Sequence, residues 1–274
     1  MVSFMREQAM ALRSGEHQRC NEAARRTRRP LIVGYVNALH YWGVEASGCT
    51  LSSELIHVSS PHRTSRPRLR GVKPHMWPSS QDVRRMSGCQ FLLASPAMAW
   101  AQISHYIDDE SLAIVGSALL CRDKVLKAAT KSELVGYVTA NPRFTGRARC
   151  MRVIPYLVEN TDSPPEIQVH MLLYGIANIT TNHPVQTRDR RWRFIDIAIP
   201  DVKVGIEYQG AYHSDPAQMR SDATRMNELI AMGWIIIQAT AADLRTEETR
   251  NRFVKSIVEI VNRRRHALLA GMQL

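Results

Sequence analysis

The sequence predicts an α/β fold, α+β overall, in which a small mixed α+β domain precedes a C-terminal domain with the element order αβββαβ. Three observations favour this fold. Hydrophobic residues make up 45% of the 274 residues, enough to fill substantial cores. The apolar run 234–237 has the length of a strand. Two helix starts combine a capping residue with a proline, at Ser163-Pro164 and at Asp215-Pro216.

Composition narrows the expected partners and location. The 36 lysines and arginines exceed the 25 aspartates and glutamates, for a net charge of +11. This excess favours nucleic acid, DNA first, over an acidic membrane surface. The five cysteines form no CxxC pair, which argues against a disulfide framework and a zinc ribbon. The N-terminus has no apolar run of signal-peptide length, so we expect a cytoplasmic protein without a membrane segment.

Three segments are expected along the chain: a basic helical segment at 1–30, a small α+β domain at 31–145 and a second domain at 146–274. In the first segment a helix leads into Arg25-Arg26-Thr27-Arg28-Arg29-Pro30. The proline prevents the helix from continuing. The arginine stretch is either a solvated linker or an arm that contacts phosphates.

The 31–145 domain has helical and strand patterns in mixed order. We expect helices at 34–42, 97–106 and 111–120, and strands at 55–59 and 72–77. The loop between the two strands, 61–71, has turn residues at both ends. It carries Arg63, Arg66, Arg68 and Arg70. These arginines either bind a DNA or RNA backbone or belong to a solvated loop.

The C-terminal domain has the clearest element pattern. Ser163 is a good N-cap, Pro164 fits the first helical position, and Glu166 stands where a capping box places an acid. Helices are expected at 163–175, 215–232 and 247–269, and strands at 182–186, 192–199, 203–209 and 234–240. The expected buried face of the second helix consists of Met219, Ala223, Met226 and Ile230.

Two carboxylates are expected to meet across the hairpin of the second and third strands. A turn centred between Asp201 and Val202 sets Asp196 opposite Glu207, on one face of the sheet. Gln209 shares the side of Glu207 because side chains alternate along a strand. Two ionised carboxylates about 4 Å apart repel by about 4 kcal/mol at an effective dielectric constant of about 20. A divalent cation would relieve this repulsion, and hard oxygen ligands suit Mg²⁺ or Mn²⁺.

Several motifs follow one another between 163 and 269. They are Ser163-Pro164-Pro165-Glu166, Phe194-Ile195-Asp196, Ile206-Glu207-Tyr208-Gln209-Gly210, His213, Asp222-x-x-Arg225 and Gly233-Trp234. In this order they resemble the very-short-patch-repair-like branch of the PD-(D/E)XK nucleases. The resemblance implies a restriction-endonuclease-like core and a metal-dependent DNA endonuclease that hydrolyses phosphodiester bonds.

The resemblance also implies roles for single residues. Asp196 and Glu207 would bind Mg²⁺ or Mn²⁺, and the carbonyl of Tyr208 would join them as a metal ligand. Gln209 occupies the place usual for a catalytic lysine. This departure matters because glutamine can donate hydrogen bonds but cannot help to deprotonate the attacking water. Active members of the family with glutamine at this place are known.

Two further residues have both a catalytic and a structural interpretation. Glu166 would be an additional carboxylate of the site, or would only complete the capping box. His213 would assist the leaving group or contact phosphate, or would be an ordinary surface histidine. Asp222 and Arg225, three residues apart on a helix, are expected to form an ion pair that braces the site.

A second group of arginines precedes the aspartate strand motif. Arg188, Arg190, Arg191 and Arg193 surround Trp192. We expect Arg190, Arg191 and Arg193 to form a basic rim that holds the phosphate backbone without contacting base edges.

The region before the nuclease-like domain has a resemblance of its own. Ala38-Leu39-His40-x-x-Gly43, Ile56-His57-Val58-Ser59 and Ala94-Ser95-Pro96 are similar to motifs of the AbiEi-like antitoxin domain. It implies a DNA-binding domain or one that contacts a protein partner. Two functions therefore stand side by side: a metal-dependent endonuclease, and a DNA-binding transcriptional regulator or antitoxin-like protein with an inactive nuclease fold. The sequence sets no oligomeric state.

Overall fold

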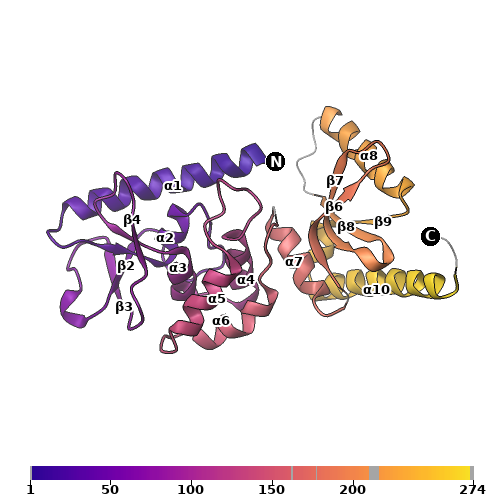
Figure 1. Ribbon diagram of the computed structural model, residues 1–274. Helices are drawn as coiled ribbons and strands as arrows, with labels where there is room; N and C mark the ends of the chain where they lie inside the picture. Colours follow the sequence, from indigo (N-terminus) through magenta and orange to yellow (C-terminus); the bar gives the residue numbers. More distant parts are fainter. Residues whose placement is uncertain (1, 162, 177, 210–215, 272–274) are drawn as a thin grey trace. The chain divides into compact units, whose positions relative to one another are not determined.

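The computed structural model describes residues 2–161, 163–176, 178–209 and 216–271, without side chains for 2–4 and 216–219. The chain forms two compact units, Met1–Asp162 and Ser163–Leu274 (Figure 1). Both units are mixed α/β, as the sequence predicts. Among the helices described, none combines the length and apolar character that a membrane span requires.

The first unit is built on a five-stranded mixed sheet. Its strands are β1 (Ile32–Val33), β2 (Ile56–Ser60), β3 (Val72–Met76), β4 (Val83–Arg85) and β5 (Leu92–Ala94), in the spatial order β3-β2-β1-β5-β4. β1 pairs antiparallel with β2 and parallel with β5. β2 and β3 pair in parallel, and β4 and β5 antiparallel. The strands expected at 55–59 and 72–77 are confirmed as β2 and β3.

Helices accompany this sheet. They are α1 (Val2–Arg25), α2 (Tyr35–Tyr41), α3 (Pro96–Ile103), α4 (Asp109–Ala118), α5 (Lys131–Ala140) and α6 (Arg147–Val153), with short 3-10 turns η1 (Arg63–Ser65) and η2 (Ile154–Tyr156). Ser95 starts α3, because its Oγ accepts the backbone N–H of Met98 at 3.1 Å. Leu39, Leu93 and Trp100 are fully buried in this unit.

The first unit extends past the expected domain boundary near residue 145. α6 contacts both α4 and α5, and its Cys150 and Val153 are buried. The chain between 146 and 161 therefore completes the helical layer of the first unit, and the second unit begins at Ser163. No disulfide joins the five cysteines, all of which lie in the described part of the chain.

The second unit contains a four-stranded sheet in the order β6-β7-β8-β9. The strands are β6 (Thr180–Gln186), β7 (Trp192–Ile199), β8 (Val204–Gln209) and β9 (Ile235–Thr240), and η3 (Pro200–Val202) connects β7 with β8. β6, β7 and β8 pair antiparallel, and β8 pairs in parallel with β9. The helices are α7 (Pro164–Leu173), α8 (Pro216–Ala231), α9 (Ala241–Leu244) and α10 (Glu247–Leu269). The predicted order αβββαβ is therefore confirmed, with the last helix following it.

The sheet of the second unit has an apolar cluster on each face. One cluster joins α7 and α10 to the strands through residues such as Leu173, Ile206 and Ile257. The other contains Leu229 of α8, packed with Ile195 and Trp234. Val204, Ile206 and Tyr208 belong to the first cluster, which confirms the predicted alternation along β8.

The predicted buried face of α8 is right only at Met226, which is half-buried and whose sulfur accepts a hydrogen bond from Gln238 Nε2 of β9 at 3.7 Å. Ala223 is exposed and Ile230 is 52% exposed, whereas Leu229 is buried. Met219 lies outside the residues whose side chains are described. The side of α8 that faces the sheet includes Leu229, and the polar residues on that side hide it from a search for an apolar stripe.

Candidate active site

Asp196 and Glu207 lie in the register that the symmetric turn predicts. β7 and β8 pair through Ile197↔Ile206, Ala198↔Gly205 and Ile199↔Val204. Asp196 and Glu207 are the next residues of the two strands after the pair Ile197↔Ile206. The backbone N–H of Tyr208 donates a hydrogen bond to Asp196 Oδ2 at 3.2 Å. The Asp196 carboxyl therefore reaches across the end of the ladder toward β8.

The Asp196 carboxyl lies in a strongly acidic environment. Burial raises its pKa most, and the negative charges of Glu207 and Glu166 raise it further, to about 8. The Tyr208 N–H and the charge of Arg225 act in the opposite direction. The charges of Glu207 in β8 and of Glu166 in α7 therefore both act on the Asp196 carboxyl.

Glu207 is buried and has a cationic partner. Its exposed fraction is 5%, and both carboxylate oxygens accept hydrogen bonds from Arg225 of α8, with Nη1–Oε1 and Nη2–Oε2 distances of 3.0 and 2.7 Å. Arg225 Nη1 also donates to the carbonyl of Phe194 at 3.0 Å. Such a two-bond ion pair is among the strongest polar contacts in proteins. Glu207 pulls the pKa of Arg225 upward, against the effect of burial.

Arg225 changes two of the sequence expectations. The repulsion between the carboxylates is offset in part by this guanidinium, and a metal ion is not the only compensating charge. Arg225 pairs with Glu207 and not primarily with Asp222, although the charge of Asp222 acts on it as well. The sequence could have indicated that Arg225 faces the sheet. Arg225 lies on the same side of α8 as Asp222 and Leu229, and Leu229 is buried. The apolar residues Ala223, Met226 and Ile230, each one position further along the helix, form a competing stripe about 100° away.

Glu166 does not complete the capping box that the sequence offers as its structural role. Ser163 is the N-cap residue of α7, yet its side chain makes no capping bond to the backbone. Its Oγ instead donates to Glu166 Oε1 at 2.7 Å. Glu166 is 7% exposed, and its charge reaches Asp196.

Three further residues are predicted for the site, and the structure describes two of them, Gln209 and Tyr208. Gln209 is exposed at the end of β8 and pairs in register with Thr240. Tyr208 is partly buried, with its ring packed against the α7 and α10 cluster. His213 lies outside the described residues.

The site offers oxygen donors, the ligand type that Mg²⁺ and Mn²⁺ prefer. Within the described residues no three histidine, cysteine or acidic side chains are gathered closely enough to hold a metal between them. A structural zinc site needs about four protein ligands, whereas Mg²⁺ is usually held by one or two carboxylates, with water and substrate phosphate completing the shell. A carboxylate has about four lone-pair positions, so Glu207 keeps acceptor capacity beside Arg225. Asp196 and Glu207 are the residues that would hold the ion, with the Tyr208 carbonyl as a further oxygen.

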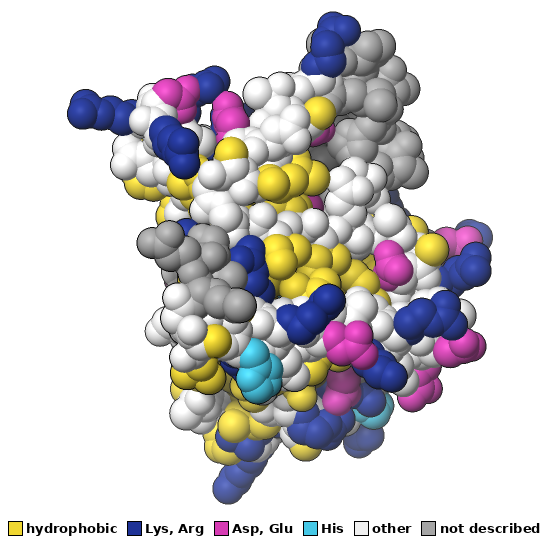
Figure 2. Space-filling model, turned by 90° about the vertical axis from the view of Figure 1, so that its right-hand side faces the viewer, with side chains coloured by type: hydrophobic (Ala, Val, Ile, Leu, Met, Phe, Trp, Pro, Cys, Tyr) yellow, Lys and Arg dark blue, Asp and Glu magenta, His cyan; other side chains and the backbone are white. Residues whose placement is uncertain are grey.

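The expected basic rim is largely neutralised by acids. Glu228 of α8 accepts from Arg191 Nη2 at 2.9 Å and from Arg193 Nε, and Arg191 also pairs with Asp189. The hydrogen bond from Arg193 is the main cause of a lowered pKa for Glu228. Arg190 is exposed, and no described acid pairs with it. Figure 2 shows a face of the molecule on which basic and acidic side chains are interspersed around a group of hydrophobic ones.

The loop arginines of the first unit have a different environment. Arg63, Arg66, Arg68 and Arg70 are all exposed, between β2 and β3, where the sequence predicts a loop. Their side chains form no ion pair with any described residue. This group therefore presents positive charge that is not compensated within the described part of the unit.

Comparison with known proteins finds distant relatives. The chain is 25% identical over 206 residues to two uncharacterized proteins of Mycobacterium tuberculosis, MT2308 of strain CDC 1551 and Rv2248 of strain H37Rv. The similarity covers 73% of this chain and 72% of each relative. No family model matches the chain, and no solved structure does.

Proposed function

We propose that the second unit is a Mg²⁺- or Mn²⁺-dependent DNA endonuclease of the very-short-patch-repair-like type. The observation that carries the proposal is the pairing of β7 with β8, which sets Asp196 next to Glu207 while the Tyr208 N–H holds the Asp196 carboxyl at 3.2 Å. When all three acids are ionised, the single positive charge of Arg225 leaves two negative charges in excess. A divalent cation matches this excess in charge and in ligand preference.

The residues of the chain have separate tasks in this proposal. Bound to the site, the cation would polarise the scissile phosphate and lower the pKa of the attacking water. Asp196 and Glu207 hold it, and the Tyr208 N–H keeps Asp196 in place. Arg225 fixes the orientation of Glu207 through its two hydrogen bonds. Gln209 can hydrogen-bond to the attacking water or to the phosphate, but it cannot accept the proton as a base.

A second candidate function rests on Arg225 and Gln209. A guanidinium that occupies both oxygens of Glu207 lowers the demand for a metal ion, and a glutamine replaces the usual lysine. Both features favour a DNA-binding regulator or antitoxin-like protein in which the nuclease fold has lost turnover. In such a protein turnover would be lost although both acids, Asp196 and Glu207, are still present.

Cleavage of supercoiled plasmid and of single-stranded DNA in Mg²⁺ or Mn²⁺ separates the two functions. We expect cleavage by the wild-type chain and none by Glu207→Ala. Asp201→Asn is the matched control, because Asp201 is an exposed acid of the adjoining turn η3. Equal cleavage by wild type and Glu207→Ala rejects the assigned site. An inactive wild type that binds DNA in a salt-dependent manner supports the regulator.

A further inference from the structure

Two basic segments that are far apart in the sequence lie side by side in the first unit. Arg26 Nη2 donates to the carbonyl of Arg70 at 3.3 Å, and Arg29 Nη1 donates to the carbonyl of Thr64 at 3.2 Å. Each bond joins the segment after α1 to the loop between β2 and β3. The two segments therefore form one surface, here called the arginine surface: Arg25, Arg26, Arg28, Arg29, Arg63, Arg66, Arg68 and Arg70.

The segment after α1 has a defined local structure. Thr27 Oγ1 accepts the backbone N–H of Arg29 at 3.2 Å, and the same hydroxyl lies 3.4 Å from the Arg29 carbonyl, to which it donates. Pro30 then fixes the entry into β1. Because the backbone is held in this way, the arginine side chains start from fixed positions and lose less freedom on binding.

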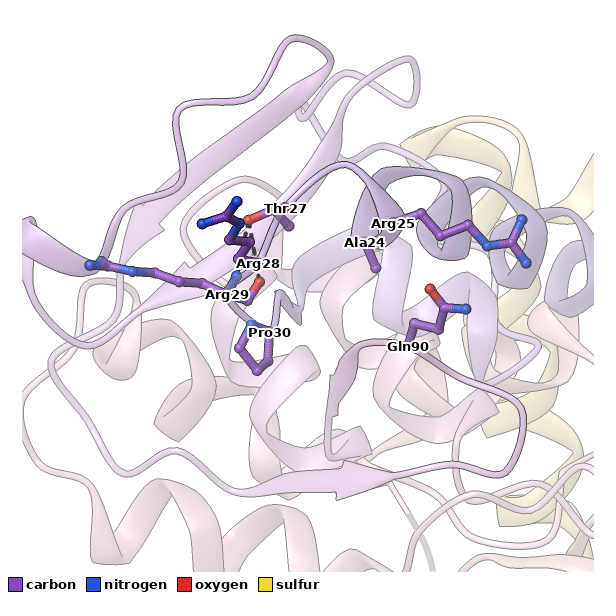
Figure 3. Close-up of a pocket in the computed structure, with 7 residues that line it drawn as sticks. All are labelled: Ala24, Arg25, Thr27, Arg28, Arg29, Pro30 and Gln90. Carbon is purple, nitrogen blue, oxygen red and sulfur yellow. Dashed lines mark hydrogen bonds between the residues drawn. The ribbon is translucent and has the colours of Figure 1, made fainter.

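A shallow pocket of about 340 Å³ lies within this segment. It is lined by Ala24, Arg25, Thr27, Arg28, Arg29, Pro30 and Gln90. Figure 3 shows that Arg28 and Arg29 extend to one side of it, whereas Arg25 extends to the other side, above Gln90. The guanidinium groups do not converge on one point. This arrangement suits successive phosphates of a chain better than a single free anion.

The charge of the arginine surface has no internal compensation among the described residues. None of its eight arginines forms an ion pair with a described acid, in contrast to Arg191 and Arg193 of the second unit. Clustered cations of one sign attract a polyanion over a long range and release its counterions when they bind it. All eight are arginines, whose planar fork matches phosphate oxygens in pairs.

A membrane surface is a poorer match for the same charges. Proteins that bind the bilayer interface combine basic residues with large apolar side chains that enter the acyl region. Among the described residues, the exposed large hydrophobic side chains include none from 25–30 or 61–71. The surface offers guanidinium groups without an apolar anchor.

We propose that the arginine surface binds the sugar-phosphate backbone of nucleic acid, without contacts that select a base sequence. This function belongs to the first unit and goes beyond the cleavage proposed for the second. The bond pattern assigns Arg26 and Arg29 to holding the two segments together. The exposed side chains of Arg25, Arg28, Arg63, Arg66, Arg68 and Arg70 contact phosphates.

Salt-dependent binding of a duplex of arbitrary sequence tests the proposal on the full chain. Binding is measured by fluorescence anisotropy in EDTA, so that no metal-dependent cleavage interferes. Three double variants are compared with wild type: Arg25→Gln with Arg28→Gln in the segment, Arg66→Gln with Arg68→Gln in the loop, and Lys124→Gln with Arg143→Gln as a control. Lys124 and Arg143 are exposed cations of the same unit outside both segments.

We expect both the segment variant and the loop variant to bind more weakly. In each variant, the slope of the logarithm of the binding constant against the logarithm of the salt concentration should become shallower by about 1 to 2. Each lost phosphate contact lowers the steepness of this slope by about 0.9. The control variant should keep the wild-type slope, and Arg→Lys replacements at the same four positions should retain most of it. Unchanged circular dichroism confirms that the variants are folded.

Two results would overturn the proposal. One is an unchanged slope in the segment variant or in the loop variant, because each segment must contribute to one surface. The other is a wild-type chain that binds vesicles containing anionic lipid, with variants that lose this vesicle binding and still bind the duplex as wild type does. The outcome is distinguishable from failure of the nuclease proposal, since Glu207→Ala should abolish cleavage and leave the salt slope unchanged.

Discussion

Arg225 of α8 and Glu207 of β8 form an ion pair with two hydrogen bonds, of 3.0 and 2.7 Å. The carboxylate side chain is 6% exposed and the guanidinium side chain 28%. The pair fastens α8 to the strand that carries the central acid of the site. Structural stability and the geometry of the candidate active site therefore depend on the same two side chains.

Replacing Arg225 should destabilise the fold more than replacing a neighbouring arginine. Arg225→Ala leaves Glu207 buried without its partner. We expect a loss of about 2–4 kcal/mol in the free energy of unfolding, less than the cost for a fully buried pair because Arg225 is partly exposed. Urea denaturation measures it. Arg220→Ala, an exposed arginine of the same helix, should change the free energy by less than about 0.5 kcal/mol. Equal losses in the two variants would contradict the structural role of the pair.

The raised pKa of Asp196 predicts a pH-dependent stability. Burial and the neighbouring acids raise the pKa of the folded Asp196 carboxyl from its ordinary value of 3.8 to about 8, so between these pH values the folded state binds more protons than the unfolded state. Stability without metal should therefore fall as pH rises from about 4 to about 8, and level off above that. Denaturation at several pH values in EDTA measures this slope.

Asp196→Asn is the control for the pH dependence. The variant should be more stable than wild type near pH 8 and should lose most of the slope, because its amide does not ionise. Adding Mg²⁺ should stabilise wild type more at pH 8 than at pH 5, since the cation favours the ionised carboxylate. A slope that persists in Asp196→Asn would show that other groups cause it.

Gln209 should affect turnover and leave the fold intact. Its side chain is exposed, so Gln209→Ala should change the free energy of unfolding by less than about 0.5 kcal/mol. If glutamine positions the water or the phosphate, kcat for plasmid cleavage should fall by roughly 10-fold or more with KM little changed. Gln209→Lys should cleave at least as fast as wild type. An unaltered kcat in Gln209→Ala would remove Gln209 from the site.

Glu228 should weaken DNA binding by the second unit. It neutralises Arg191 and Arg193, which the sequence assigns to the phosphate backbone. Glu228→Gln should release part of their charge, so that duplex binding in EDTA becomes tighter and the salt slope steeper by about 1. Asp201→Asn removes the same charge from an exposed turn and serves as the control. Weaker binding in Glu228→Gln would mean that the ion pairs are needed to shape the surface.

The second unit could be predicted largely because its signals are local. Proline after a capping residue gives the starts of α7 and α8, and the turn at Asp201 sets the register of β7 and β8. The register follows from symmetry about the turn and needs no knowledge of distant contacts. The same symmetry places Asp196 opposite Glu207.

The features that the sequence does not predict depend on contacts between residues that are distant in the sequence. β1 and β5, of two and three residues, exist because they pair with each other across the chain, and such short pieces show no alternation. The role of Arg225 requires knowing which side of α8 meets the sheet. The contact of Arg29 with the 61–71 loop is likewise invisible until the two segments are placed together in space.

The most direct test of the acid site is to measure Mn²⁺ binding to the full chain by titration calorimetry near pH 8. We predict that wild type and Asp201→Asn bind Mn²⁺ with similar affinity and that Asp196→Asn loses most of this binding. Equal Mn²⁺ binding by wild type and Asp196→Asn, or none by wild type, would contradict the assignment of Asp196 and Glu207 as a divalent-cation site.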